Sequence, residues 1–247
     1  MTPVITLVII AVLILALALL MRRIQTGSIV ALRPLRGYTG LQGQVGRAIE
    51  SGSQLHITLG RASLIGDANP TSISALTVLD HVAKDGCANS TPPLVTLADG
   101  TLLTAAQASM VHSYHQAGRS ADYDATATQF IADNTDAIAY SGGVASLIHQ
   151  EKVTSNVMVG RFGSELGIIT EAADRKQIDQ VIGSDDPNAL ALATAVTDNL
   201  LIGEELLAAG AYLEQAPQQL ASLKLQDILR WVIAAGILVT AVLSFVL

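Results

Sequence analysis

The stretch PLVTLADGTLLTAAQASMVHSYHQAG, residues 93–118, decides the fold class, because a short β-like run is followed at once by a helical one. Residues 93–99 predict a strand, and residues 101–118 predict a helix that a glycine closes. The same pair recurs along the chain. Strands are expected at 55–60, 93–99, 128–133, 155–163 and 178–184, and helices at 70–86, 101–118, 135–152, 164–177 and from 189 to about 213.

This alternation of strands and helices is typical of a parallel sheet that carries helices on both faces. We therefore expect an α/β fold with a Rossmann-like, doubly wound, mostly parallel sheet of about five strands. The stretch GLQGQVGRAIESG, residues 40–52, is expected to add a leading helix. The roughly 200 residues between the two ends of the chain suffice for one domain with its own core.

Both ends of the chain are apolar. Residues 4–21 and 231–247 contain no charged residue. A helix of about 18 residues rises about 27 Å, close to the thickness of the roughly 30 Å hydrocarbon layer. We therefore predict transmembrane helices at 1–23 and 224–247. For the second run, a buried C-terminal core helix is the alternative, although no polar face interrupts it.

Basic residues flank the predicted spans on one side only. In a cleaved signal peptide the basic residues precede the apolar run, whereas here they follow the first one. Because basic flanks stay in the cytoplasm, both termini should lie outside and residues 24–223 should form a cytosolic domain. The residues expected to contact lipid headgroups are Arg22, Arg23, Arg33, Arg36, Lys224 and Arg230.

Composition narrows the function classes. The chain has a single cysteine, Cys87, which cannot form an intramolecular disulfide and fits a reducing compartment. Residues 37–223 contain 20 acidic and eight basic residues. Such an acidic domain repels phosphate backbones, and no basic stripe with interleaved aromatic residues is present, so nucleic-acid binding is not expected.

Charged residues follow several of the predicted strands. Ligands of parallel α/β sheets bind beyond the carboxyl ends of the strands, so these residues are candidates for a binding site. Asp99 and Asp133 could hold a cation or a ribose hydroxyl, and Arg161 could clamp an anion. Glu165 and Asp185 complete the set. The alternative is that the acidic residues cap helices by accepting hydrogen bonds from free backbone N–H groups.

Motifs for catalysis or cofactor binding are weak. The stretch VGRFGSE, residues 159–165, lies between a strand and a helix but lacks the lysine and Ser/Thr of a nucleoside-triphosphate loop. His112 and His115 are three residues apart on a predicted helix, and no third ligand stands nearby in the sequence. We therefore predict no catalytic residue, no metal site and no cofactor.

The stretch ALALATAVTDNLLIGEELLAAGAYL, residues 189–213, carries apolar residues on more than one face of a predicted helix. Such a helix must be buried, either in its own domain or against another subunit. Two membrane anchors would confine copies to a plane and favour self-association. The candidate contact residues are Gly203, Glu205, Ala209, Gly210 and Tyr212.

Three blocks of the sequence resemble a known family. They are VGRAIESGSQLHITLG at 45–60, SNVMVGRFGSELGIITEA at 155–172 and NLLIGEELLAAGAYL at 199–213. The chain resembles an uncharacterised bacterial membrane-protein family that carries a domain of unknown function. The resemblance implies a bacterial membrane protein and transfers no catalytic residue.

Two functions follow as hypotheses. The first is a non-catalytic scaffold of the bacterial cytoplasmic membrane, whose cytosolic domain assembles with itself or joins a larger membrane complex. The second is a membrane-tethered nucleotide or small-metabolite binding protein, or an enzyme, that uses the strand-end residues. The lipid bilayer is the expected partner in both.

Overall fold

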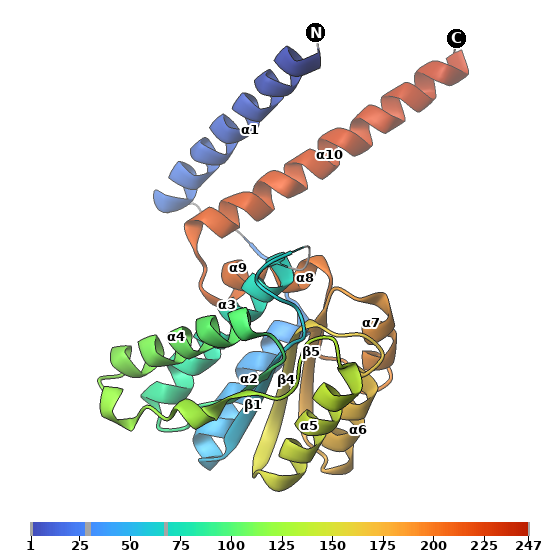
Figure 1. Cartoon of the computed structure of the whole chain (residues 1–247). Coiled ribbons are helices and arrows are strands. Elements are labelled where there is room, and N and C mark those ends of the chain that lie inside the picture. Colours follow the sequence, from blue (N-terminus) through green and yellow to red (C-terminus); the bar gives the residue numbers. More distant parts are fainter. Residues whose placement is uncertain (1, 28–30, 67–68, 247) are drawn as a thin grey trace. The chain divides into compact units, whose positions relative to one another are not determined.

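The computed structural model describes residues 2–27, 31–66 and 69–246. The chain divides into two compact units (Figure 1). The helical unit comprises residues 1–33 and 210–247, and the sheet unit comprises residues 34–209.

The sheet unit contains one six-stranded sheet in which all neighbouring strands are parallel. The strands are β1 (Gln54–Gly60), β2 (Leu94–Leu97), β3 (Thr128–Phe130), β4 (Val153–Arg161), β5 (Asp179–Ser184) and β6 (Leu200–Ile202). Their order is β3-β2-β1-β4-β5-β6, so successive strands are added to one side of β1 and then to the other. The α/β class and the parallel sheet predicted from the sequence are confirmed.

A helix joins each strand to the next, because parallel neighbours cannot be joined by a tight turn. The helices are α2 (Arg36–Ser51), α3 (Asn69–Ala88), α4 (Gly100–Gln116), α5 (Ala137–Gln150), α6 (Leu166–Arg175), α7 (Pro187–Ala193) and α8 (Glu204–Leu207). Two short 3-10 turns, η1 (Ser120–Asp122) and η2 (Ala125–Ala127), lead into β3.

The central strands are buried on both faces. Met158 of β4 and Ile182 of β5 belong to a hydrophobic cluster that contains residues of α5, α6 and α7. Consecutive strand residues point to opposite faces, so the buried side chains of Val157 and Val181 point away from this cluster. Helix α2 contacts both of these strands, and α3 contacts β1 and β4. Burial on two faces fits the consecutive apolar residues in the middle of these strands, Val157–Val159 and Val181–Ile182.

Glycines allow α2 to pack closely on β6. A Cβ atom on Gly37 would lie 2.5 Å from Cγ of Leu201 and 2.7 Å from the carbonyl oxygen of Leu200. A Cβ atom on Gly40 would lie 2.7 Å from the side chain of Asn199. The glycine-rich start of α2 therefore serves helix–strand packing.

A hydrogen bond links the first and last helices of the sheet unit. Helix α2 begins at Arg36, and β6 leads through Gly203 directly into α8. The hydroxyl of Tyr38 donates a hydrogen bond to the carbonyl oxygen of Glu205, with an O–O distance of 2.7 Å. Tyr38 is 3% exposed, and the bond is partly buried.

A sixth strand lies where the sequence predicts part of a helix. The prediction of one helix from Ala189 to about Leu213 is wrong: α7 ends at Ala193, and β6, α8 and α9 follow. Gly203 has a φ of +52°, a conformation that interrupts a helix. The three apolar residues between Asn199 and Gly203 pair with β5 instead, so the sheet has six strands rather than about five.

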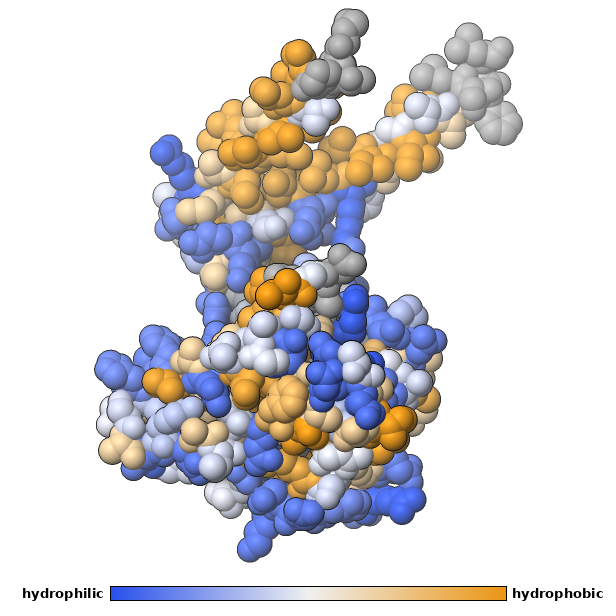
Figure 2. Space-filling view, in the orientation of Figure 1, coloured by the Kyte–Doolittle hydropathy of each residue, from blue (hydrophilic) through white to orange (hydrophobic). Residues whose placement is uncertain are grey.

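The helical unit contains α1 (Thr2–Gln25) and α10 (Pro217–Val246), and α9 (Ala209–Leu213) lies at its boundary. Both long helices are apolar and long enough to cross a membrane, over Val4–Gln25 and Pro217–Val242. The most apolar part of each is unburied, whereas Leu220 and Ala221 near the start of α10 are buried. Figure 2 shows hydrophobic surface along both helices. Helix α10 begins before the predicted span at 224–247, and the prediction that both termini lie outside stays a prediction.

Replacement of Gly37 by alanine should lower the free energy of unfolding by about 2 kcal/mol, because the added methyl group overlaps Leu201. Gly46 lies in the same helix with no atom within 4 Å of its Cβ position, so Gly46→Ala should raise the free energy by about 0.5–1 kcal/mol. Urea unfolding of the full chain in detergent, followed by circular dichroism, measures both. Equal effects of the two substitutions would contradict the packing of α2 on β6.

Candidate functional site

The carboxyl edge of the sheet is the candidate site, because parallel sheets bind ligands where the strand order reverses. That point lies between β1 and β4. The two strands meet closely there: Gly60 has a φ of +75°, and a Cβ atom on it would lie 2.7 Å from the carbonyl oxygen of Arg161. The N–H of Arg61 donates to the same carbonyl oxygen at 3.1 Å. Arg61 directly follows β1, and Arg161 is the last residue of β4.

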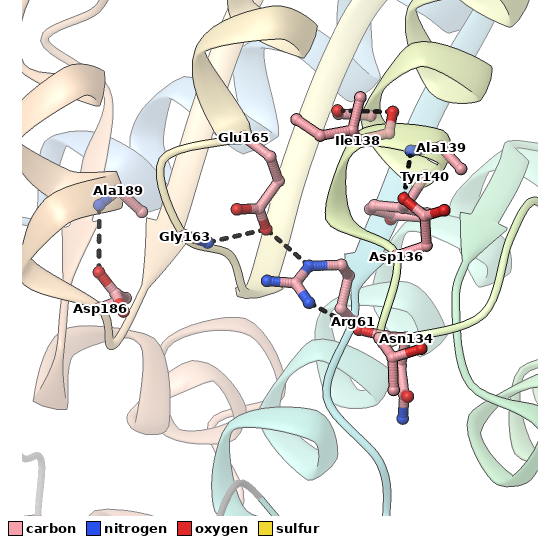
Figure 3. Close-up of polar contacts among 12 residues, drawn as sticks. Arg61, Asn134, Asp136, Ile138, Ala139, Tyr140, Gly163, Glu165, Asp186 and Ala189 are labelled. Atoms are coloured by element: carbon pink, nitrogen blue, oxygen red, sulfur yellow. Dashed lines mark hydrogen bonds and ion pairs between the residues drawn. The ribbon is translucent and has the colours of Figure 1, made fainter.

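Arg61 ties the end of β1 to two neighbouring loops (Figure 3). Its Nε donates to Oε1 of Glu165 at 2.7 Å, and its Nη1 donates to the carbonyl oxygen of Asn134 at 2.6 Å. The N–H of Gly163 donates to the same carboxylate oxygen at 2.8 Å. Only 4% of the Glu165 side chain and 23% of the Arg61 side chain are exposed. The pair is therefore a partly buried structural link.

Arg161 makes a second, more exposed link at the end of β4. Its Nη2 lies 2.8 Å from Oδ2 of Asp185, and its Nε lies 3.2 Å from the same atom. The hydroxyl of Thr71, in the first turn of α3, donates to this oxygen at 2.8 Å. Asp185 thus joins β4, the loop after β5 and α3.

Both acidic partners are held in their charged form. Burial by itself raises the pKa of Glu165, but hydrogen bonds from Gly163 and Arg61 outweigh it and hold the pKa below its ordinary value. Burial likewise raises the pKa of Asp185, and the hydrogen bonds from Arg161 and Thr71 lower it by more. Each arginine is therefore matched by an ionised carboxylate at neutral pH.

The other strand-end acids cap helices or turns, as the alternative interpretation of the sequence expected. Oδ1 of Asp99 accepts from the N–H groups of Thr101 and Leu102, at 2.9 and 3.0 Å, and caps α4. Oδ1 of Asp133 accepts from the N–H and the hydroxyl of Thr135, at 3.0 and 2.6 Å. The bond from the Thr135 hydroxyl lowers the pKa of Asp133. These carboxylates are engaged within their own turns.

The structure connects some of the predicted residues and separates others. Asp99 reaches the Arg61 cluster through Asn134, whose Nδ2 lies 3.5 Å from Oδ2 of Asp99. Arg161 and Glu165, predicted as one group, belong to different clusters. Among the residues that the structure describes, no group of three or more His, Cys, Asp and Glu residues could hold a metal ion.

Sequence reasoning missed Arg61 and Asn134. A signal for Arg61 was present, because it directly follows the glycine that ends the first strand, as Arg161 follows Gly160. Asn134 contributes its carbonyl oxygen, which any residue could supply, so no signal of residue type could have indicated that contact. Asp136 was also missed as the cap of α5, whereas Asp186, next to Asp185 at the end of β5, caps α7 as the capping alternative expects.

A row of buried polar side chains crosses the sheet on the face of α5. Nδ1 of His56 lies 2.7 Å from Oδ1 of Asn156, and Nε2 lies 2.9 Å from the hydroxyl oxygen of Thr96. One position further along β1, on the same face, the hydroxyl of Thr58 bonds that of Tyr140. Burial lowers the pKa of His56 to about 4, although the bond to Asn156 opposes this, so the imidazole is neutral. Because His56 has no exposed surface, the row is part of the core.

The predicted contact residues of the stretch 199–213 lie in different environments. Gly203 precedes α8, and Oε2 of Glu205 accepts from the N–H of Ile202 at 3.1 Å. Ala209 and Gly210 are buried within the chain. The hydroxyl of Tyr212 donates to the carbonyl oxygen of Arg33 at 2.8 Å. Contact of this stretch with a second copy stays a prediction.

Four of the predicted headgroup residues lie in the long helices, and the other two lie before and at the start of α2. Arg22 and Arg23 are exposed in the last turn of α1. Lys224 is half-buried, and Nη1 of Arg230 lies 3.7 Å from Oδ1 of Asp227 on α10. The remaining two differ in position: Arg33 is exposed before the sheet unit, and Arg36, at the start of α2, lies 3.8 Å from Asp198.

The family described as a domain of unknown function, DUF6754, matches residues 1–247. The chain belongs to this family. No curated protein and no solved structure matches the chain. Membership of DUF6754 agrees with the resemblance seen in the sequence at the level of a domain of unknown function, and it assigns no site residue.

Replacement of Arg61 by glutamine should lower the free energy of unfolding by about 3 kcal/mol, because it leaves the buried carboxylate of Glu165 without its cation. The double variant Arg61→Gln/Glu165→Gln should recover part of this loss. Arg175 forms an exposed pair with Glu171, so Arg175→Gln should cost about 0.5 kcal/mol at most. Urea unfolding in detergent measures all three. Similar losses for Arg61→Gln and Arg175→Gln would contradict a buried link.

The neutral, buried His56 should make stability depend on pH. Its pKa is about 4 in the folded chain and 6.5 as its ordinary value, so the unfolded state binds more protons between these values. The free energy of unfolding should therefore fall as the pH falls from 6.5 towards 4, by up to about 3 kcal/mol. His56→Gln should remove this pH dependence of the free energy of unfolding. His115 is exposed, and His115→Gln should leave the pH dependence unchanged. If the free energy of unfolding of wild type and of His56→Gln changed with pH in the same way, a neutral, buried His56 would be refuted.

Proposed function

We propose that the protein is a non-catalytic scaffold of the bacterial cytoplasmic membrane, anchored by α1 and α10, whose sheet unit lies in the cytosol. There it self-assembles or joins a larger membrane complex. Support for anchoring comes from two helices of membrane-spanning length that carry apolar side chains on unburied surfaces. A long apolar helix that is not covered by protein needs another apolar environment, which a bilayer supplies.

The non-catalytic part of the proposal rests on one observation: the charged side chains at the β1/β4 switch point are paired with one another or with backbone groups. Arg61 is bound by Glu165 and Arg161 by Asp185, while Asp99 and Asp133 accept hydrogen bonds from their own turns. Catalytic sites hold charged groups with unmet interactions or strongly shifted pKa values ready for a substrate. Here the groups stabilise the junction between the two halves of the sheet.

Self-association is supported by exposed aliphatic side chains. Ile202 at the end of β6 and Leu207 in α8 are 52% and 47% exposed, and they flank the predicted contact residues Gly203 and Glu205. Ile65, in the loop after β1, is 78% exposed, and Ile73 of α3 is 52% exposed. Helices α3 and α8 are in contact, so two of these side chains belong to neighbouring elements. Exposed apolar patches of this kind are typical of protein contact surfaces.

Small-metabolite or nucleotide binding is the second candidate, favoured by one observation. The strand order 3-2-1-4-5-6 is that of Rossmann-like, doubly wound dinucleotide-binding folds, in which the ligand lies at the β1/β4 switch point. Arg61 and Arg161 stand at this point. An anionic ligand would have to displace Glu165 or Asp185 from its arginine.

Membrane extraction and mass measurement test the scaffold. The full chain should stay in the membrane pellet after alkaline carbonate, and lipid nanoparticles should contain complexes of more than one copy. Leu207→Asp should weaken self-association about tenfold or more, because a charge enters the contact. Leu192→Asp, which changes a side chain on α7 that is 40% exposed, should not.

Three results would contradict the proposal. Release of the chain by carbonate would exclude anchoring, and a single copy bound to no other protein would exclude assembly. Thermal stabilisation by ATP or pyrophosphate that Arg61→Gln or Arg161→Gln abolishes would favour the metabolite-binding alternative.

A further inference from the structure

A groove lies between α1 and α10 within the helical unit. It has a volume of about 540 Å³, which falls in the range of ligand-binding pockets. Most of its wall is aliphatic, and one end carries two guanidinium groups. The lining residues are Ala16, Leu19, Leu20, Arg22, Arg23, Thr26, Leu225 and Ile228.

The packing of the two helices forms this groove. On α1, Leu13, Ala16, Leu17, Leu20 and Ile24 are partly buried, at the three- and four-residue spacing of one helix face. This face packs against the first half of α10, since the two helices are in contact and Leu225 is also partly buried. In Figure 1 the helices are closest where α1 ends and α10 begins, and they diverge towards their other ends.

Charged side chains lie at one end of the groove, and apolar side chains line the rest of it. Arg22 and Arg23 are exposed, whereas Ala16 and Leu19 lie one to two turns earlier on α1, inside the apolar run. The described lining residues include two cations and no carboxylate. The hydroxyl of Thr26 donates to the carbonyl oxygen of Arg23 at 2.9 Å, so the arginines supply the hydrogen-bond donors at this end.

We propose that this groove binds one anionic phospholipid, with its phosphate on Arg22 and Arg23 and an acyl chain along Ala16, Leu19 and Ile228. The proposal rests on the membrane anchoring proposed above. Basic pockets between membrane helices bind anionic headgroups, and the arginines lie where an apolar span meets the phosphate layer. A free phosphate would use the arginines alone and would leave the aliphatic wall uncovered, so the shape favours a lipid.

Occupancy by a lipid would stabilise the pair of helices. Between diverging helices, an acyl chain contacts apolar side chains of both, and a phosphate bound to α1 fixes the depth of that chain. The lipid would then act as a structural component of the scaffold and would hold the two anchors together.

Lipid retention by the full chain tests the proposal. The protein is reconstituted in nanodiscs with equal amounts of phosphatidylglycerol and phosphatidylcholine, extracted in mild detergent and examined by native mass spectrometry. One phosphatidylglycerol should be retained per chain. Arg22→Gln/Arg23→Gln should weaken its retention about 30-fold, from about 1 kcal/mol for each arginine. Arg33→Gln/Arg36→Gln removes the same charge from two predicted headgroup residues that do not line the groove, and it should weaken retention much less.

A second pair of variants tests the acyl-chain wall without changing charge. Ala16→Trp fills the groove and should abolish retention of the lipid. Ala18→Trp changes an exposed position of α1 that does not line the groove, and it should leave retention unchanged. Equal losses in the two double-arginine variants would show general adsorption of anionic lipid and overturn the proposal. Unchanged retention in Ala16→Trp, or equal retention of both lipids by the wild type, would also overturn it.

Carbonate extraction of membranes that contain the full chain separates this proposal from the one on which it rests. A chain that stays in the membrane but retains no phosphatidylglycerol refutes the groove and leaves the anchoring intact. A chain that carbonate releases refutes both.

Discussion

The close contact between the ends of β1 and β4 is the constraint on which the sheet unit depends. Glycines at positions 60 and 160 have positive φ angles, and a side chain on either would meet the backbone of the neighbouring strand. The strand order reverses at this contact, so it joins the two halves of the sheet. Arg61 and Arg161 project from the same point, and their carboxylate partners come from loops around it. Charge pairing therefore reinforces a junction that the backbone geometry creates.

The fold class could be predicted because local signals agreed with it. Buried strands such as 93–99 and the helices that follow them have distinct lengths and end at glycine or aspartate, and each signal is contained in fewer than 20 residues. The region of Leu200 to Ile202 could not be assigned this way. Its three apolar residues continue the pattern of a helix, and only pairing with β5, a contact distant in sequence, makes them a strand.

The candidate site was predictable in position but not in its contacts. Strand ends are visible in the sequence, so Asp99, Arg161 and Asp185 could be placed at one edge. Which charged residues pair with one another depends on which loops lie close in space. The strand order determines this, and local sequence patterns do not reveal the strand order. Arg61 shows the limit: it pairs with a glutamate more than 100 positions later in the chain.

The hydrogen bond between Tyr38 and Glu205 has a mechanical consequence. It links the segment that follows α1 to the segment that leads to α10, and all six strands of the sheet lie between its two residues in the sequence. A force that pulls α1 and α10 apart would act first on this hydrogen bond and on the packing of α2 against β6. Helix α2 also contacts β4 and β5, so these strands would share the load.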